Sequence, residues 1–143
     1  MEAVQALYEN RLGEAKGTAV EEAVQKNFQG ETSEVGLYLA MAIQAQREGY
    51  PEIAEAFRSI AWDEAGHAAR YALLNGMVSN STRENLERML AGEQMANRSK
   101  REAAIRAREV AGEETYAVFD ETSRDEARHA SMLAGLLRRY FGD

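Results

Sequence analysis

Apolar residues recur every three or four positions along most of this chain, which predicts a largely helical protein. Glycine and proline interrupt the pattern at Gly49-Tyr50-Pro51, after Gly76 and at Ala111-Gly112, where helices are expected to end or begin. Thr18 with Glu21, and Ser81 with Glu84, have the spacing of capping boxes, which mark helix starts. The pattern therefore predicts four long helices, over about residues 18–48, 51–76, 81–110 and 113–140.

These elements suggest one all-α domain covering residues 1–143. Its parts are a short leader helix within residues 1–15, a first helical hairpin over residues 18–76 and a second over residues 81–140. An internal repeat supports this division, because identical residues recur 62 positions apart, and six such pairs identify it. The pairs are Gly30 and Gly92, Glu31 and Glu93, Phe57 and Phe119, Asp63 and Asp125, Glu64 and Glu126, and His67 and His129.

The repeat contains both histidines of the chain, each three residues after a glutamate, in Glu64-x-x-His67 and Glu126-x-x-His129. Positions three apart share one face of a helix, and here that face is otherwise apolar. Glu31 and Glu93 lie on the apolar faces of the other two helices. Buried, uncompensated carboxylates are costly, so these glutamates are expected to be protonated or to surround cations.

One glutamate from each of two helices, with Glu-x-x-His from each of the other two, is the ligand pattern of di-metal ferritin-like four-helix bundles. Oxygen-rich ligands with one imidazole per metal favour iron or manganese. We therefore expect two iron ions, with manganese or a mixed pair as alternatives. The predicted ligands are Glu31, Glu64, His67, Glu93, Glu126 and His129.

Three neighbouring residues are candidates for supporting this centre. Asp63 and Asp125 can each accept a hydrogen bond from the histidine of the opposite hairpin, unless they lie on a solvated face. Tyr38, two turns after Glu31, is either a hydrogen-bond donor to a bound oxidant or a core tyrosine.

Composition narrows the possible partners. The formal charge is 17 − 24 = −7, which argues against nucleic acid as a ligand. No run of 18 apolar residues and no signal-peptide core are present, so we expect a cytoplasmic protein without a membrane span. Five basic residues of the third predicted helix are expected to form a solvated face, or to dock an acidic electron donor. They are Arg98, Lys100, Arg101, Arg106 and Arg108.

The sequence resembles the rubrerythrin group of ferritin-like proteins over about residues 16–140. The stretch KGTAVEEAVQKNFQGETSEVGLYLAMAIQAQREGY resembles their first helix and IAEAFRSIAWDEAGHAARY their second. AGEQMANRS is similar to the start of their third helix and YAVFDETSRDEARH to their fourth. The resemblance implies a non-haem di-iron site that reduces hydrogen peroxide or reacts with dioxygen.

Two departures from the rubrerythrin pattern change what the resemblance implies. Rubrerythrins usually carry a rubredoxin domain with a four-cysteine iron, but this sequence has no cysteine, so electrons are expected from an external donor such as a rubredoxin. Rubrerythrins also have an extra glutamate at the position of Ala96, which exchanges with a histidine at one iron. Glu34 lies 62 residues before Ala96. We therefore predict Glu34 as a metal ligand and redox-switching carboxylate that competes with His129. The alternative is that Glu34 lies at the edge of the apolar helix face and bonds an arginine or water.

The predicted function is peroxide reduction at a di-iron centre. The alternatives are a ferroxidase or iron-handling protein, a di-metal oxidase that activates dioxygen, and a metal-free structural bundle.

The link between hairpins favours a homodimer. The second and third helices of a ferritin-like bundle run parallel, so the link must rise roughly 36 Å, whereas residues 77–81 span at most about 20 Å when extended. Exchanging hairpins between two chains removes this conflict, so we expect a domain-swapped dimer. The alternative is an up-down-up-down monomer.

Overall fold

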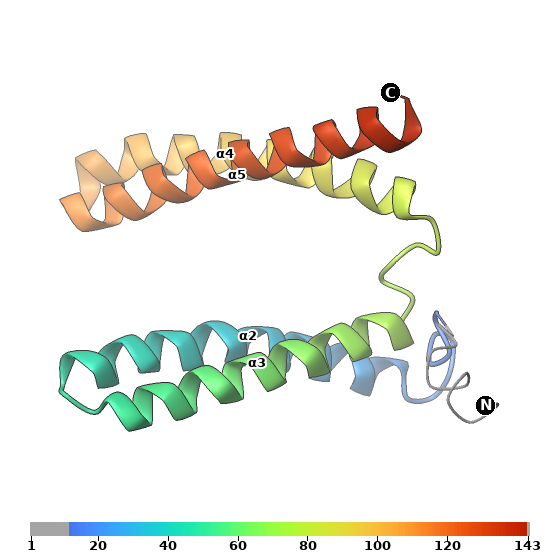
Figure 1. The fold of residues 1–143 in the computed structure, drawn as a ribbon, viewed down its shortest axis with the longest axis horizontal. Coiled ribbons are helices and arrows are strands. Elements are labelled where there is room, and N and C mark those ends of the chain that lie inside the picture. The colour runs from blue at the N-terminus through green and yellow to red at the C-terminus, as the bar shows by residue number, and fades with distance from the viewer. Residues whose placement is uncertain (1–11, 143) are drawn as a thin grey trace. The chain divides into compact units, whose positions relative to one another are not determined.

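The computed structural model describes residues 12–142, and every regular element in this range is a helix. The helices are α2 (Glu21–Arg47), α3 (Pro51–Leu74), α4 (Thr82–Val110) and α5 (Glu113–Phe141) (Figure 1). This confirms the all-α class. Most of the leader helix predicted within residues 1–15 lies outside the described residues, and residues 12–20 form turns rather than a helix. Among the described helices, none combines the length and apolar character needed to cross a lipid bilayer.

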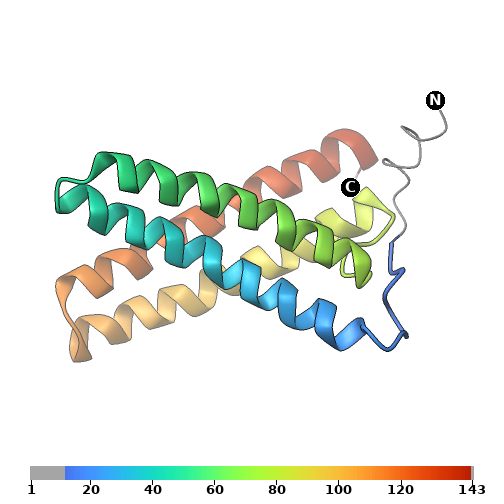
Figure 2. The same ribbon diagram turned by 90° about the horizontal axis from the view of Figure 1, so that it is seen from below.

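The helices pair as two antiparallel hairpins, α2 with α3 and α4 with α5 (Figures 1 and 2). The chain divides into two compact units between Asn80 and Ser81. Each unit holds one hairpin, and the predicted single domain over residues 1–143 stays a prediction.

Most turns lie where glycine, proline and capping residues predicted the helices to end or begin. Gly49 has a φ of +87°, and Pro51 occupies the first turn of α3. The Ser81 hydroxyl accepts a hydrogen bond from the Glu84 backbone N–H at 3.3 Å, which confirms this residue as the N-cap of α4.

The predicted start at Thr18 is wrong, because α2 begins at Glu21. The Thr18 hydroxyl donates to the Ala15 carbonyl at 2.6 Å, so it belongs to the preceding turn. The Glu21 carboxylate accepts instead from the Gly17 N–H at 2.9 Å.

The segment before α2 caps the C-terminal end of α3 through backbone hydrogen bonds. The Gly13 and Ala15 N–H groups donate to the carbonyls of Leu73 and Leu74 at 2.8 and 2.9 Å. Gly76 has a φ of +61°, and a Cβ built there would lie 3.3 Å from the Cα of Gly13. Two glycines therefore permit the backbones to approach and satisfy carbonyls that a helix end leaves unpaired.

Small side chains fill the interface within each hairpin. Ala42, Ala45 and Ala54 are buried together against Phe57 in the first hairpin, and Ala104, Ala107 and Ser123 are buried in the second. Large apolar side chains nevertheless remain exposed, including Trp62 at 80%, and also Leu37, Ile43, Ile105 and Val110. A single hairpin therefore leaves substantial apolar surface uncovered.

Candidate metal centre

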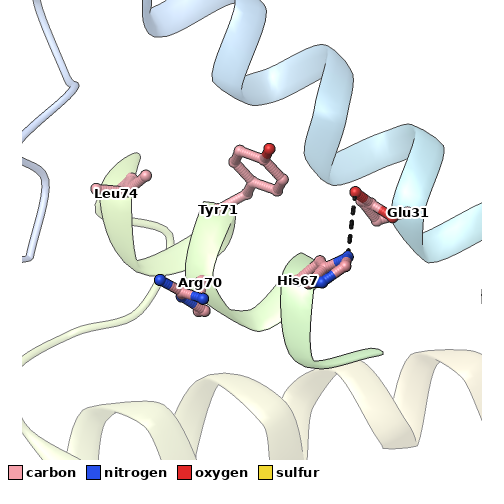
Figure 3. A pocket seen from close by; sticks show the side chains of 5 residues that line it. All are labelled: Glu31, His67, Arg70, Tyr71 and Leu74. Atoms are coloured by element: carbon pink, nitrogen blue, oxygen red, sulfur yellow. Dashed lines mark ion pairs between the residues drawn. The ribbon is translucent and has the colours of Figure 1, made fainter. Parts of the chain in front are cut away.

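The first hairpin brings together Glu31 of α2 with Glu64 and His67 of α3. His67 Nδ1 lies 3.3 Å from Glu64 Oε2 and 3.6 Å from Glu31 Oε1. Figure 3 shows the Glu31 carboxylate directed across the helix interface at the His67 ring. One turn of α3 thus places the histidine beside its own glutamate, and helix pairing supplies the second carboxylate.

The second hairpin repeats this arrangement with Glu93 of α4 and Glu126 and His129 of α5. His129 Nδ1 lies 3.2 Å from Glu126 Oε2 and 3.5 Å from Glu93 Oε2. The corresponding distances in the two hairpins differ by no more than about 0.1 Å, so the sequence repeat is also a structural repeat. We call the two groups the α2–α3 triad and the α4–α5 triad.

Each triad offers three ligand atoms that all lie within 4.8 Å of one another. The four glutamate side chains are 15–19% exposed, whereas His67 is 50% exposed and His129 is 42% exposed. The carboxylates are therefore largely removed from water within each hairpin.

Proximity of the two carboxylates changes their proton affinities. The pKa of Glu31 is raised, first by its hydrogen bond with Glu64 and then by burial. The pKa of Glu93 is raised in the same way by Glu126. Their partners move in the opposite direction: the pKa of Glu64 is lowered, mainly by the hydrogen bond from Glu31. As pH falls, the first proton that each metal-free triad binds is therefore shared between its two carboxylates.

The pKa of Glu126 falls further, to about 2, because both Glu93 and the Lys100 ammonium donate to it. Lys100 Nζ reaches from α4 to Glu126 Oε1 on α5. The sequence prediction that Lys100 belongs to a solvated basic face is therefore wrong. Its signal in the sequence is the seven-residue spacing from Glu93, which places both residues on one face of α4.

The residues of both triads fit a divalent metal. Glu93 Oε2 is buried and faces His129 Nδ1 at 3.5 Å, but it accepts no hydrogen bond, although a buried carboxylate oxygen normally does. Two carboxylates and one imidazole per triad provide oxygen-rich ligands of the type that iron and manganese prefer. A cation bound there can replace the shared proton and supply the missing partner of Glu93.

Glu34 lies beside the α2–α3 triad. It is exposed, and it lines a pocket of about 430 Å³ together with Glu31, Glu64 and His67. Its negative charge contributes to the raised pKa of Glu31. The position is compatible with a ligand that moves toward a metal, and this role stays a prediction.

The predicted supporting residues occupy different environments. Asp125 accepts a hydrogen bond from Arg128 at 2.9 Å on the same helix, and Asp63 is exposed. Their predicted bonds to the histidines of the opposite hairpin stay predictions. The Tyr38 ring lies 5.9 Å from the Phe57 ring, so within its hairpin this tyrosine packs as a core residue.

A second pocket, of about 350 Å³, is also lined by Glu31 and His67 (Figure 3). Arg70, Tyr71 and Leu74 complete its lining. The pocket gives a small molecule a route to the α2–α3 triad, past one guanidinium and one phenol group.

The raised and lowered pKa values predict how the stability of the metal-free protein varies with pH. Because the pKa values of Glu31 and Glu93 are raised, the native state binds protons at a higher pH than the unfolded chain. The free energy of unfolding is therefore expected to increase as pH falls from neutral through these raised values. Below the ordinary value of 4.5, the lowered pKa of Glu126 reverses this trend, and its contribution is lost as pH falls toward about 2.

Urea unfolding midpoints, measured against pH in the presence of a chelator, test this expectation. Glu93→Gln is the matched variant, because it removes the carboxyl group whose raised pKa is expected to increase stability through the α4–α5 triad. A midpoint that decreases steadily from neutral pH downward would contradict the shared proton.

Comparison with known proteins agrees with this geometry. A family model described as Rubrerythrin matches residues 22–83. An uncharacterized protein of Methanocaldococcus jannaschii is 56% identical over 133 residues, which cover 93% of this chain and 94% of that protein.

Two named relatives specify the family. Reverse rubrerythrin-1 of Clostridium acetobutylicum is 46% identical over 136 residues, covering 93% of this chain and 75% of the relative. Rubrerythrin of Porphyromonas gingivalis is 32% identical over 135 residues, covering 85% and 68%. The chain therefore belongs to the rubrerythrin family, and this membership indicates a di-iron oxidoreductase of the oxidative-stress type.

Proposed function

We propose that the two triads hold two iron ions in a di-iron centre that reduces hydrogen peroxide to water. The main support is the repeated set of two carboxylates and one imidazole, together with the unpartnered buried oxygen of Glu93. Bound ferrous iron would supply the two electrons that break the O–O bond. We infer that a donor outside these 143 residues, such as a rubredoxin, returns these electrons, since the residues themselves contain no cysteine.

The residues of the chain have defined tasks in this proposal. Glu31 and Glu64 of one triad, and Glu93 and Glu126 of the other, release their shared protons when metal binds and then neutralise its charge. Reduction of peroxide to two waters consumes two protons. Carboxylates that hold a metal are deprotonated, so the two protons have to come from other groups or from solvent. The pocket beside Arg70 and Tyr71 admits a molecule as small as peroxide.

Anaerobic reconstitution with Fe(II), followed by desalting and metal analysis, tests the proposal. We expect two irons per chain and oxidation that is much faster with hydrogen peroxide than with dioxygen. Faster oxidation by dioxygen would favour a ferroxidase or an oxidase instead. Failure to retain iron would overturn the metal centre itself.

Glu34→Ala tests the redox-switching carboxylate. We expect the variant to retain two irons but to react with peroxide about tenfold more slowly. Residues next to metal ligands orient them and tune the reactivity of the metal, so their loss typically lowers activity. Stopped-flow absorbance of the reconstituted iron measures this rate. Glu22→Ala is the control, since Glu22 is an exposed glutamate of α2 that pairs with Lys26. An unchanged rate in Glu34→Ala would remove Glu34 from the mechanism.

We further propose that the hairpins pair between two chains, as a domain-swapped dimer. The exposed apolar side chains of each hairpin support a requirement for a second hairpin. The connection from the end of α3 to the start of α4 comprises only residues 75–81. Light scattering at micromolar concentration is expected to give twice the 15.9 kDa chain mass. A particle with the mass of one chain would exclude the exchange.

A further inference from the structure

A cation of the protein itself contacts the α4–α5 triad. The Lys100 ammonium contacts Glu126 Oε1, and the Lys100 side chain is 33% exposed. The other oxygen of the same carboxylate, Oε2, lies 3.2 Å from His129 Nδ1. The ammonium therefore holds one of the two oxygens that Glu126 can offer to a metal in this triad.

The α2–α3 triad has no equivalent cation at the repeated position. The residue 62 positions before Lys100 is Tyr38. Its ring packs against Phe57 at a tilt of 45°, and a phenol carries no positive charge. The two triads thus share their ligand residues and geometry, but among the ion pairs of the described residues an ammonium contacts a triad carboxylate only in the α4–α5 triad.

We propose that Lys100 is a resident counter-cation that competes with metal for Glu126, so that the α2–α3 triad binds metal first and more tightly. This inference rests on the proposed two-metal centre. A divalent ion entering the α4–α5 triad must displace the ammonium from Glu126 or bind beside it against charge repulsion. A metal entering the α2–α3 triad meets no such opposition from residue 38.

The side chain of Lys100 is suited to exchange with a metal. Its flexible stem allows the ammonium to leave Glu126 for water, because a third of the side chain is already exposed. Before metal arrives, the same ammonium compensates the negative charge of the triad. Lys100 therefore stabilises the metal-free state and weakens the second metal position.

Calorimetric titration of the metal-free protein with Mn²⁺ tests the inference without any measurement of activity. The wild-type protein is expected to bind two ions in a tight and a weak step. Lys100→Gln keeps most of the side-chain length but removes the charge, and should tighten the weak step about tenfold, the value of one charge-assisted hydrogen bond. The tight step should not change.

Arg58→Gln is the control, since Arg58 forms an exposed ion pair with Glu55 at 3.3 Å on α3 and lines neither triad. Removal of this charge should leave both steps unchanged. To assign the steps, His129→Ala should lose the weak step and His67→Ala the tight one.

Thermal unfolding gives an independent result. Lys100→Gln should lower the unfolding temperature of the metal-free protein and increase the rise produced by Mn²⁺, because the competing cation is absent. A weak step in Lys100→Gln that is unchanged or weaker would overturn the inference and leave the proposed function intact. Failure of the wild-type protein to bind two ions would instead overturn both.

Discussion

Glu126→Ala is expected to reduce the rate at which peroxide oxidises the reconstituted iron by on the order of 100-fold. Both oxygens of Glu126 in the α4–α5 triad have a partner, since Oε2 lies next to His129 and Oε1 contacts Lys100. Its removal leaves Glu93 and His129 as the remaining protein ligands of that triad. Metal analysis should therefore show one iron per chain in place of two.

Glu121→Ala is the matched control for this variant. Glu121 is an exposed residue of the same helix and lies outside the triad, so iron content and rate should both match the wild-type protein. Full iron content and an unchanged peroxide rate in Glu126→Ala would contradict the assignment of the α4–α5 triad.

Removal of metal is expected to lower the unfolding temperature by on the order of 10 °C. A metal that binds the native triads and not the unfolded chain adds its binding free energy to stability. The metal-free protein also has to keep two pairs of adjacent carboxylates, Glu31 with Glu64 and Glu93 with Glu126, largely shielded from water. Differential scanning calorimetry before and after chelation measures the difference.

The double variant His67→Ala with His129→Ala provides the control for metal removal. It lacks one ligand of each triad, so chelation should change its unfolding temperature far less than that of the wild-type protein. An equal shift in both proteins would mean that the stabilising metal binds elsewhere.

The helices were predictable because apolar spacing, glycine and proline act locally. Ser81 caps α4 as its capping box predicts, but the same pattern fails at Thr18. There the hydroxyl of Thr18 donates to the Ala15 carbonyl, because the chain before α2 turns to meet the end of α3. That turn depends on residues far apart in sequence, which a local pattern does not include.

The candidate site was predictable to the extent that helix periodicity and the repeat determine it. The Glu-x-x-His spacing places His67 beside Glu64, and the repeat places His129 beside Glu126 in the same way. Lys100 was assigned to the surface because a long basic side chain can extend toward water or across to a neighbouring helix. Only the packing of α4 against α5 shows that it reaches Glu126.

The 62-residue repeat also allows the two proposed metal positions to differ. In a centre built from two copies of one short hairpin, each substitution changes both positions at once. Here both sets of proposed ligands lie in one chain, so Glu34 has no carboxylate counterpart at Ala96, and Lys100 has no basic counterpart at Tyr38. Each proposed metal position can therefore be changed by a substitution that leaves the other intact.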